Sequence, residues 1–145
     1  KYERECLVFR NGTVTDTFKI ELGINWIGDK NYQGDRSTPE GDYKIVKRKT
    51  TGETKYYKAF LLDYPNEDDK KRFISNKKNG IIGQDATIGN LIEIHGEGGK
   101  GIDWTDGCIA LINNDMDKLF KICDIGTNVT IVGSIKPLNE ILKIE

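Results

Sequence analysis

The sequence LIEIHGEGGKGIDWTDGCIAL, from Leu91 to Leu111, consists of two short apolar runs joined by a loop rich in glycine and acidic residues. The first run ends at His95, the only histidine of the chain, and the second begins at Cys108. Both runs have the length and the glycine boundaries of buried β-strands. A loop of this length can bring the end of the first strand beside the start of the second. We therefore expect a sheet that places His95 close to Cys108.

His95 and Cys108 have the chemistry of a base and a nucleophile. A thiolate is the reactive form of cysteine, and an imidazole is the usual base that generates it near neutral pH. Because the chain has a single histidine, any Cys–His chemistry must use His95. The alternative is structural: a free cysteine is often a small buried hydrophobic residue, and a lone histidine is often a hydrogen-bonded structural one.

Three segments, in order along the chain, resemble motifs of the YkuD-type L,D-transpeptidases. The first is GDRSTPEGDYKI at residues 34–45. The second is Tyr64-Pro65-Asn66, followed by an aspartate and an arginine at positions 69 and 72. The third is His95-Gly96 followed by TDGCIAL at residues 105–111. The resemblance extends over nearly the whole chain, and three motifs in register are far more specific than one Gly-Cys pair.

The third motif departs from the family pattern at two positions. Asp106 stands where the family usually has a second histidine, and Ala110 stands where many members have arginine. The loop between His95 and Cys108 is also shorter than in the commonest members. The Asp-Trp-Thr-x-Gly-Cys form resembles a divergent branch that includes peptidoglycan endopeptidase-like members. Transfer and hydrolysis therefore both stay open as outcomes.

The resemblance implies cysteine-dependent acyl transfer on peptidoglycan stem peptides, in cell wall biogenesis and cell shape, outside the cytoplasm in the periplasm or cell wall. Cys108, activated by His95, would attack the carbonyl of the third stem residue and release the following D-alanine. An amine would then resolve the thioester in transpeptidation, and water would resolve it in carboxypeptidase or endopeptidase action. A wall-anchored lipoprotein is a candidate amine acceptor or leaving group.

The rival class is a non-catalytic cell-wall-binding or interaction domain that keeps the fold. The missing second histidine and arginine motivate it. An enzyme should have a low-pKa thiol at Cys108, whereas a binding module need not.

The resemblance also implies supporting roles near the nucleophile. The backbone N–H groups of Asp106, Gly107 and Cys108 are the candidate oxyanion donors. The carbonyl of Gly96 is the candidate orienter of the imidazole, and Asp106 is either a loop-orienting or a turn residue. Weaker candidates for substrate contact, each equally a packing residue, are Tyr57, Tyr64, Trp104 and Thr105.

Several other functions are excluded. Residues 96–101 satisfy Gly-x-Gly-x-x-Gly, but no helical period follows and no βαβ pattern surrounds them, so we predict a tightly folded loop rather than a nucleotide site. One histidine and three dispersed cysteines lack zinc-ligand spacing, and we expect no metal and no cofactor. With 22 basic and 23 acidic residues, the chain offers no argument for a nucleic-acid partner.

Nothing in the sequence predicts membrane insertion. No apolar run approaches the length that spans a bilayer, and no signal peptide is visible. Because the chain opens at Lys1 almost directly into a strand-like segment, we expect it to be trimmed at this end.

The remaining pattern predicts one mainly β domain over residues 1–145, a mixed β sandwich or open barrel with two or three helices. Asn11-Gly12 predicts a hairpin between strands at 7–9 and 13–22. Further strands are expected at 42–47, 55–64 and 128–132. Helices are expected after an Asn66 cap, over 115–123 with Asn113 or Asn114 as cap, and within 137–145. Cys123 lies on the apolar face of the second helix, so we expect no disulfide with Cys6.

Overall fold

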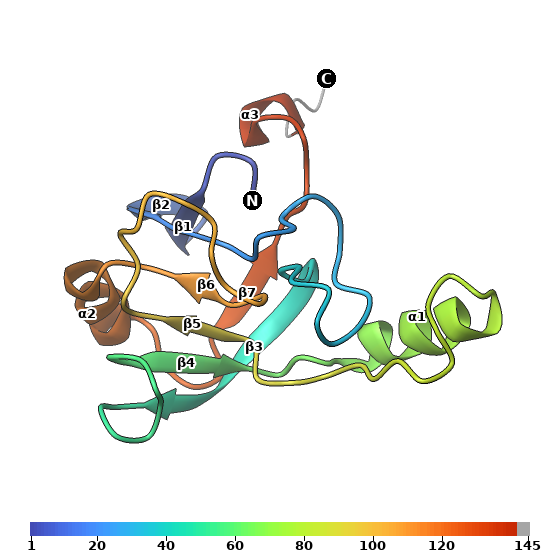
Figure 1. The fold of residues 1–145 in the computed structure, drawn as a ribbon. Helices are drawn as coiled ribbons and strands as arrows, with labels where there is room; N and C mark the ends of the chain where they lie inside the picture. The colour runs from blue at the N-terminus through green and yellow to red at the C-terminus, as the bar shows by residue number, and fades with distance from the viewer. Residues whose placement is uncertain (142–145) are drawn as a thin grey trace.

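The computed structural model describes residues 1–141, whose strands form two β-sheets accompanied by three helices (Figure 1). The smaller sheet pairs β1 (Glu5–Arg10) with β2 (Thr13–Lys19). The larger sheet has the spatial order β6-β5-β4-β3-β7, with the bounds β3 (Gly41–Lys49), β4 (Ala59–Leu62), β5 (Glu93–His95), β6 (Ile109–Ala110) and β7 (Asn128–Ile131). The helices are α1 (Glu67–Lys78), α2 (Asn113–Ile122) and α3 (Leu138–Ile141). This mainly β architecture with few helices confirms the predicted fold class.

The β1–β2 hairpin forms where the sequence predicts it. Asn11 and Gly12 adopt φ angles of 51° and 76°, the left-handed values that a two-residue type I′ turn requires. Beyond the turn, Phe18 is buried and Lys19 is exposed, as expected for a strand with one face on the core. Ile20 and Leu22 continue the buried side just past the end of β2.

One strand pair of the larger sheet is parallel. β3 pairs antiparallel with β4 and β7, and β4 pairs antiparallel with β5. In contrast, β5 and β6 are parallel, with Ile94 opposite Ile109 and His95 opposite Ala110. Both isoleucines are buried in the hydrophobic core together with Met116, Leu119 and Phe120 of α2. The loop from His95 to Cys108 therefore crosses from the end of one strand back to the start of its neighbour.

Helix α1 begins at the predicted cap. The Asn66 side chain accepts a hydrogen bond from the Asp69 N–H (2.9 Å), and the Asp69 carboxylate accepts one from the Asn66 N–H (2.9 Å). This reciprocal capping box satisfies two backbone donors at the helix start. Asp69 is buried and also accepts hydrogen bonds from Tyr43 and Arg72. Figure 1 shows α1 projecting away from the sheet, on the side opposite α2.

Helix α2 begins two residues earlier than predicted. Its N-cap is Ile112, which makes no side-chain cap bond, so the predicted Asn113 or Asn114 cap is wrong. The Asn113 amide oxygen instead accepts a hydrogen bond from the Glu97 N–H (2.8 Å), which ties the helix start to the loop after β5. Cys6, Cys108 and Cys123 all carry free thiols.

The strand predicted over 55–64 is shorter in the structure. Only 59–62 belongs to β4, and residues 55–58 form a bend before it. The end of the predicted C-terminal helix, residues 142–145, lies outside the described residues. None of the helices described within residues 1–141 has the length and apolarity needed to cross a membrane.

Candidate active site

The parallel pairing of β5 and β6 brings the thiol of Cys108 and the imidazole of His95 to one face of the sheet. Ile94 and Ile109 are opposite each other and point into the core. Successive strand residues point to opposite faces, so His95 and Cys108, which flank these isoleucines, point away from the core on the same side. The Glu93 N–H donates a hydrogen bond to Cys108 Sγ (3.4 Å), which aligns Cys108 with Glu93. The thiol and the imidazole are thus diagonal neighbours on adjacent strands.

The buried imidazole of His95 is held in a single tautomer. Its Nδ1 lies 2.6 Å from the carbonyl oxygen of Gly96, and a carbonyl can only accept, so Nδ1 carries the proton. The lone pair is then on Nε2, which is buried and has no hydrogen-bond partner within residues 1–141. Burial lowers the pKa of His95 to about 4, although the Gly96 carbonyl acts in the opposite direction. Near neutral pH the side chain is therefore a neutral base with a free Nε2.

The thiol of Cys108 is protonated at rest. Burial raises the pKa of Cys108 to about 11, while the hydrogen bond from the Glu93 N–H lowers it. This direction is opposite to the low-pKa thiol expected of an enzyme, because desolvation outweighs the donors around the sulfur in the free protein. The resting pair is a thiol and a neutral imidazole, and proton transfer to His95 is needed to form the nucleophile.

The turn before Cys108 is fastened by the hydroxyl of Thr105. Thr105 Oγ1 donates to the Cys108 carbonyl (2.7 Å) and accepts from the Gly107 N–H (3.2 Å). One of the three predicted oxyanion donors, the Gly107 N–H, is therefore directed at Thr105. Glycine is required at 107, because φ is 137° and an added Cβ would lie 2.7 Å from the Ser37 carbonyl oxygen.

Asp106 points outward from this turn. Its side chain is 84% exposed and pairs with Arg36 Nε at 3.0 Å. This geometry supports a loop-orienting position rather than direct contact with the imidazole. An ion pair this exposed contributes little to stability.

The loop after β5 is clamped by the carboxylate of Glu21. Glu21 Oε1 accepts from the N–H groups of Gly99 (3.0 Å) and Gly101 (2.8 Å), and Oε2 accepts from Trp104 Nε1 (2.6 Å). The Gly98 N–H also donates to the Leu111 carbonyl (2.8 Å). Residues 96–108 contain no helix, so the glycines serve a tightly folded loop rather than a dinucleotide turn.

Trp104 forms one wall of the site. Its ring meets His95 edge to face, with the centroids 5.8 Å apart. The ammonium of Lys100 lies 3.4 Å from the Trp104 ring centroid, in a cation–π contact. Trp104 therefore lies beside the imidazole, while its contact with a substrate stays a prediction.

Neither of the two tyrosines singled out in the sequence stacks on His95, although the Tyr57 side chain lies against Gly96. Tyr64 is buried in the core beside Tyr43, and its hydroxyl donates to the Ile88 carbonyl (3.1 Å). The Tyr57 hydroxyl donates to Asp117 Oδ2 on α2 (3.1 Å). Tyr56, which sequence reasoning missed, stacks on His95 with ring centroids 3.5 Å apart and planes 2° from parallel. The adjacent residues Tyr56 and Tyr57 indicated that a tyrosine could lie near the site. Only the bend at 55–58 decides that Tyr56 is the one that stacks on His95.

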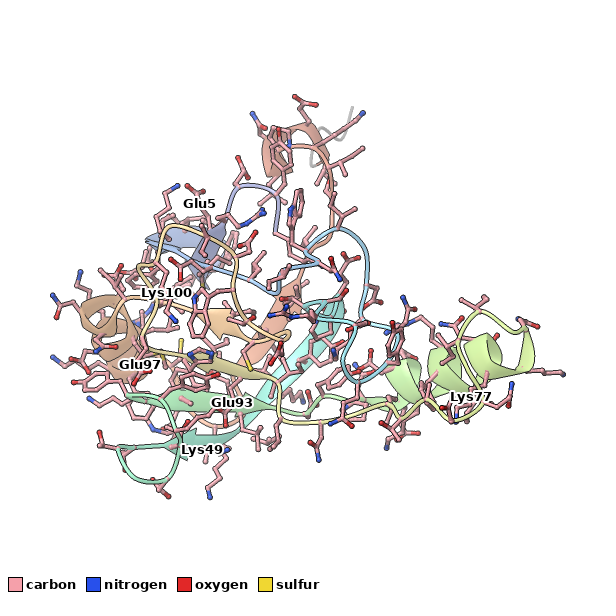
Figure 2. All side chains as sticks on the ribbon, viewed as in Figure 1. Glu5, Lys49, Lys77, Glu93, Glu97 and Lys100 are labelled. Atoms are coloured by element: carbon pink, nitrogen blue, oxygen red, sulfur yellow. The ribbon has the colours of Figure 1, made fainter. Side chains whose placement is uncertain are left out.

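A second missed residue is Glu93. Its buried carboxylate forms an ion pair with Lys49 and accepts from Thr54 Oγ1 (3.3 Å), and Figure 2 shows Glu93 and Lys49 close together beside β5. The signal was present in the sequence, since strand alternation places Glu93 on the face of His95. Within residues 1–141, no group of three or more His, Cys, Asp or Glu side chains is arranged to hold a metal ion.

Comparison with known proteins gives a consistent result. Residues 1–131 match the family described as the YkuD L,D-transpeptidase catalytic domain. An Escherichia coli protein named "Putative L,D-transpeptidase YafK" is 27% identical over 106 residues, which are 73% of this chain and 36% of that protein.

Solved structures show the same fold. Bd1075 from Bdellovibrio bacteriovorus has a TM-score of 0.66 at 25% identity, over 97% of this chain and 49% of that one. The helical cell shape determining protein Pgp2 from Campylobacter jejuni has a TM-score of 0.62 at 28% identity, over 91% and 44%. An L,D-transpeptidase from Xylanimonas cellulosilytica, at 16% identity and a TM-score of 0.55, shares the fold alone.

The chain thus spans about a third of the curated relative and about half or less of Bd1075 and Pgp2. The family match nevertheless covers most of the 145 residues, including both strands of the site and the loop between them. The chain belongs to the YkuD family of L,D-transpeptidase catalytic domains.

Proposed function

We propose that this domain is a cysteine enzyme that acts on peptidoglycan stem peptides, with Cys108 as the nucleophile and His95 as the base. The observation that supports this most directly is the buried, unpartnered Nε2 of His95 on the same sheet face as the Cys108 thiol. A buried nitrogen without a partner costs free energy, so a purely structural histidine would be expected to satisfy it. A base must keep that lone pair available.

The proposed reaction begins with proton transfer from Cys108 Sγ to His95 Nε2. The sulfur attacks the carbonyl carbon of the third stem residue, diaminopimelate or its equivalent, and forms a C–S bond. The C–N bond to the following D-alanine breaks, and the leaving amine takes the proton from His95. The product is a thioester on Cys108 and a free amino acid, or a longer amine where a cross-link is cleaved.

The oxyanion of this step needs fixed donors. Because the Gly107 N–H is directed at Thr105, we assign this role to the N–H groups of Cys108 and Asp106. Thr105 holds the turn that presents them, through its hydrogen bond to the Cys108 carbonyl.

The fate of the thioester is the finer part of the proposal. We propose that water competes seriously with amine acceptors, so that hydrolysis accompanies or exceeds cross-linking. Ala110 is fully buried and supplies no cation beside the nucleophile to hold an acceptor carboxylate. Under this proposal the enzyme works outside the cytoplasm, where stem peptides are found. A wall-anchored lipoprotein is one candidate acceptor or leaving group.

Digestion of purified tetrapeptide muropeptides, with product masses read out, tests the proposed function. We expect release of D-alanine by the wild-type domain and no release by Cys108→Ser. Cys123→Ser is the matched control, because Cys123 is also a free thiol but lies at the end of α2, in the core-facing region. Equal turnover by Cys108→Ser and the wild type would rule out Cys108. A folded wild type with no turnover on any stem peptide would favour the wall-binding alternative.

A further inference from the structure

Tyr56 covers one face of the His95 imidazole. The ring centroids are 3.5 Å apart and the ring planes differ by 2°. Because His95 is fully buried, the Tyr56 ring is part of what separates the imidazole from water. A parallel stack this close also restricts rotation of the imidazole, since turning the ring would push its edge into the phenol. The stack therefore fixes the direction in which Nε2 points.

Tyr56 is itself held from two sides of the site. Its N–H donates to Thr54 Oγ1 (3.2 Å), and the same hydroxyl donates to the Glu93 carboxylate (3.3 Å). Trp104 meets the Tyr56 ring edge to face at 6.2 Å between centroids. These contacts connect the Tyr56 ring to the strand that carries His95 and to the loop that leads to Cys108.

We infer that Tyr56 is a positioning residue for the catalytic base: its ring holds the His95 imidazole in one plane, shields it from water, and keeps Nε2 directed toward Cys108. The inference rests on the proposed role of His95 as base. The ring is the required part, because the stack involves the face of the phenol and not its hydroxyl.

Charged groups of both signs face the imidazole from the elements around it. Glu93 of β5 raises the pKa of His95, while Lys55 beside Tyr56 and Lys100 of the loop lower it. The Cys108 thiol faces it from the neighbouring strand. Burial is the largest influence and lowers the pKa. These charged groups stay in the chain when Tyr56 is replaced, and only Lys55 loses a contact, the one with the Tyr56 ring. Because burial is the largest influence, loss of the ring acts mainly by admitting water and raises the pKa of His95 toward its ordinary value of 6.5.

The single histidine of the chain makes this measurable, because one imidazole gives one set of ring NMR signals. In Tyr56→Leu we expect the pKa of His95 to rise and the ring ¹⁵N shifts to report a mixture of tautomers. We expect kcat to fall on the order of tenfold, KM to change by less than about twofold, and the acid limb of kcat to move to higher pH. Tyr56→Phe, which keeps the ring, should match the wild type in all five.

Tyr57→Phe is the matched control, since it removes the hydroxyl that bonds to Asp117 and keeps the ring that lies against Gly96. It should leave the His95 signals unchanged. An unchanged pKa and tautomer of His95 in folded Tyr56→Leu would overturn the inference. A fall in kcat in Tyr56→Phe equal to that in Tyr56→Leu would also overturn it. If Tyr56→Leu does not fold, Tyr56→Met provides the same comparison. A wild type without turnover would refute the proposed function, whereas the NMR titration would still decide the positioning role.

Discussion

His95 combines two features that are unfavourable for stability, a buried Nε2 without a partner and a lowered pKa. Its Nε2 is buried without a partner, and an unsatisfied buried polar atom costs about 1–3 kcal/mol. Its pKa is lowered to about 4 by burial, so the ring stays neutral across the physiological range. The Cys108 thiol also keeps its proton in the free protein, because burial raises its pKa.

Replacing His95 by alanine should remove turnover while leaving the fold. Loss of a general base typically lowers the rate by about 10²–10⁴-fold. Circular dichroism and muropeptide turnover, measured on the same preparations, check this. Full activity with a native spectrum would show that another group deprotonates Cys108.

The lowered pKa of His95 predicts a pH-dependent stability. The unfolded chain takes up a proton at His95 near the ordinary pKa of 6.5, whereas the folded chain does so only near 4. The unfolded state therefore binds more protons between these values, and the free energy of unfolding falls as the pH drops from about 6.5 toward 4. Urea unfolding at pH 7 and pH 5 should show that the free energy of unfolding falls less between these pH values in His95→Ala than in the wild type. If the free energy of unfolding fell equally in the two proteins, burial of His95 would not be the cause of the pH dependence.

Asp106 should be secondary to His95. Its carboxylate is exposed and paired with Arg36, and an ionised carboxylate cannot replace an imidazole as a donor. We expect Asp106→Asn to reduce turnover by far less than His95→Ala and to leave the unfolding free energy within about 0.5 kcal/mol of the wild type. Equal losses of turnover in the two variants would place Asp106 in the catalytic set.

Among the elements, strand pairing is what assembles the site. The apolar runs before His95 and after Cys108 were enough to predict two strands, because strand periodicity is a local property. Their parallel direction was not predictable from that pattern, since direction depends on how the loop crosses over. The start of α2 was mispredicted for a related reason: the Asn113 side chain bonds to the Glu97 N–H of the loop and not to its own helix.

The ion pair beneath the site gives a prediction about β3 and β5. Lys49 and Glu93 have side chains only 13% and 8% exposed, so removing one partner leaves a buried charge unpaired. We expect Glu93→Gln to lower the free energy of unfolding by about 3 kcal/mol, and Lys49→Met combined with Glu93→Gln to recover much of that loss.

The control for this pair is Glu67→Gln in α1, which breaks an exposed pair with Lys70 and should lower the free energy of unfolding far less than Glu93→Gln. Urea unfolding of the wild type, Glu93→Gln, the double variant and Glu67→Gln gives the change in unfolding free energy for each variant. A loss at Glu93 no larger than the loss at Glu67 would mean that the Lys49 charge is well solvated in the folded chain.

For the whole molecule, the mainly β class, the hairpin and the caps of α1 followed from local sequence. The proposed nucleophile and base were also named from the sequence, because residues 95–96 and 105–111 resemble the family motif and the chain has a single histidine. Tyr56 did not follow, because its place beside His95 depends on the bend at 55–58. Strand alternation does place Glu93 on the face of His95, but its ion pair with Lys49 depends on how β3 lies relative to β5. Tyr64 was a candidate for substrate contact, but its side chain packs in the core.

The balance between hydrolysis and cross-linking is a property of the whole site. With Ala110 buried and no cation at that position, we expect an amine acceptor to be poorly held and water to resolve the thioester. Incubation with a tetrapeptide muropeptide should give monomeric tripeptide in amounts comparable to or above cross-linked dimer. Dimer as the dominant product, with little tripeptide, would restore L,D-transpeptidation as the main activity.

The most direct test of the central claim is to trap the acyl-enzyme. The domain, in excess over a tetrapeptide muropeptide, is quenched in acid within a single turnover and analysed by peptide mass spectrometry. If Cys108 is the nucleophile, the peptide that contains it carries a tripeptide-stem acyl group, labile to hydroxylamine as a thioester is, and His95→Ala quenched at the same time lacks that group. Product formation without that adduct, or an acyl group on Cys6 or Cys123 instead, would contradict this role of Cys108.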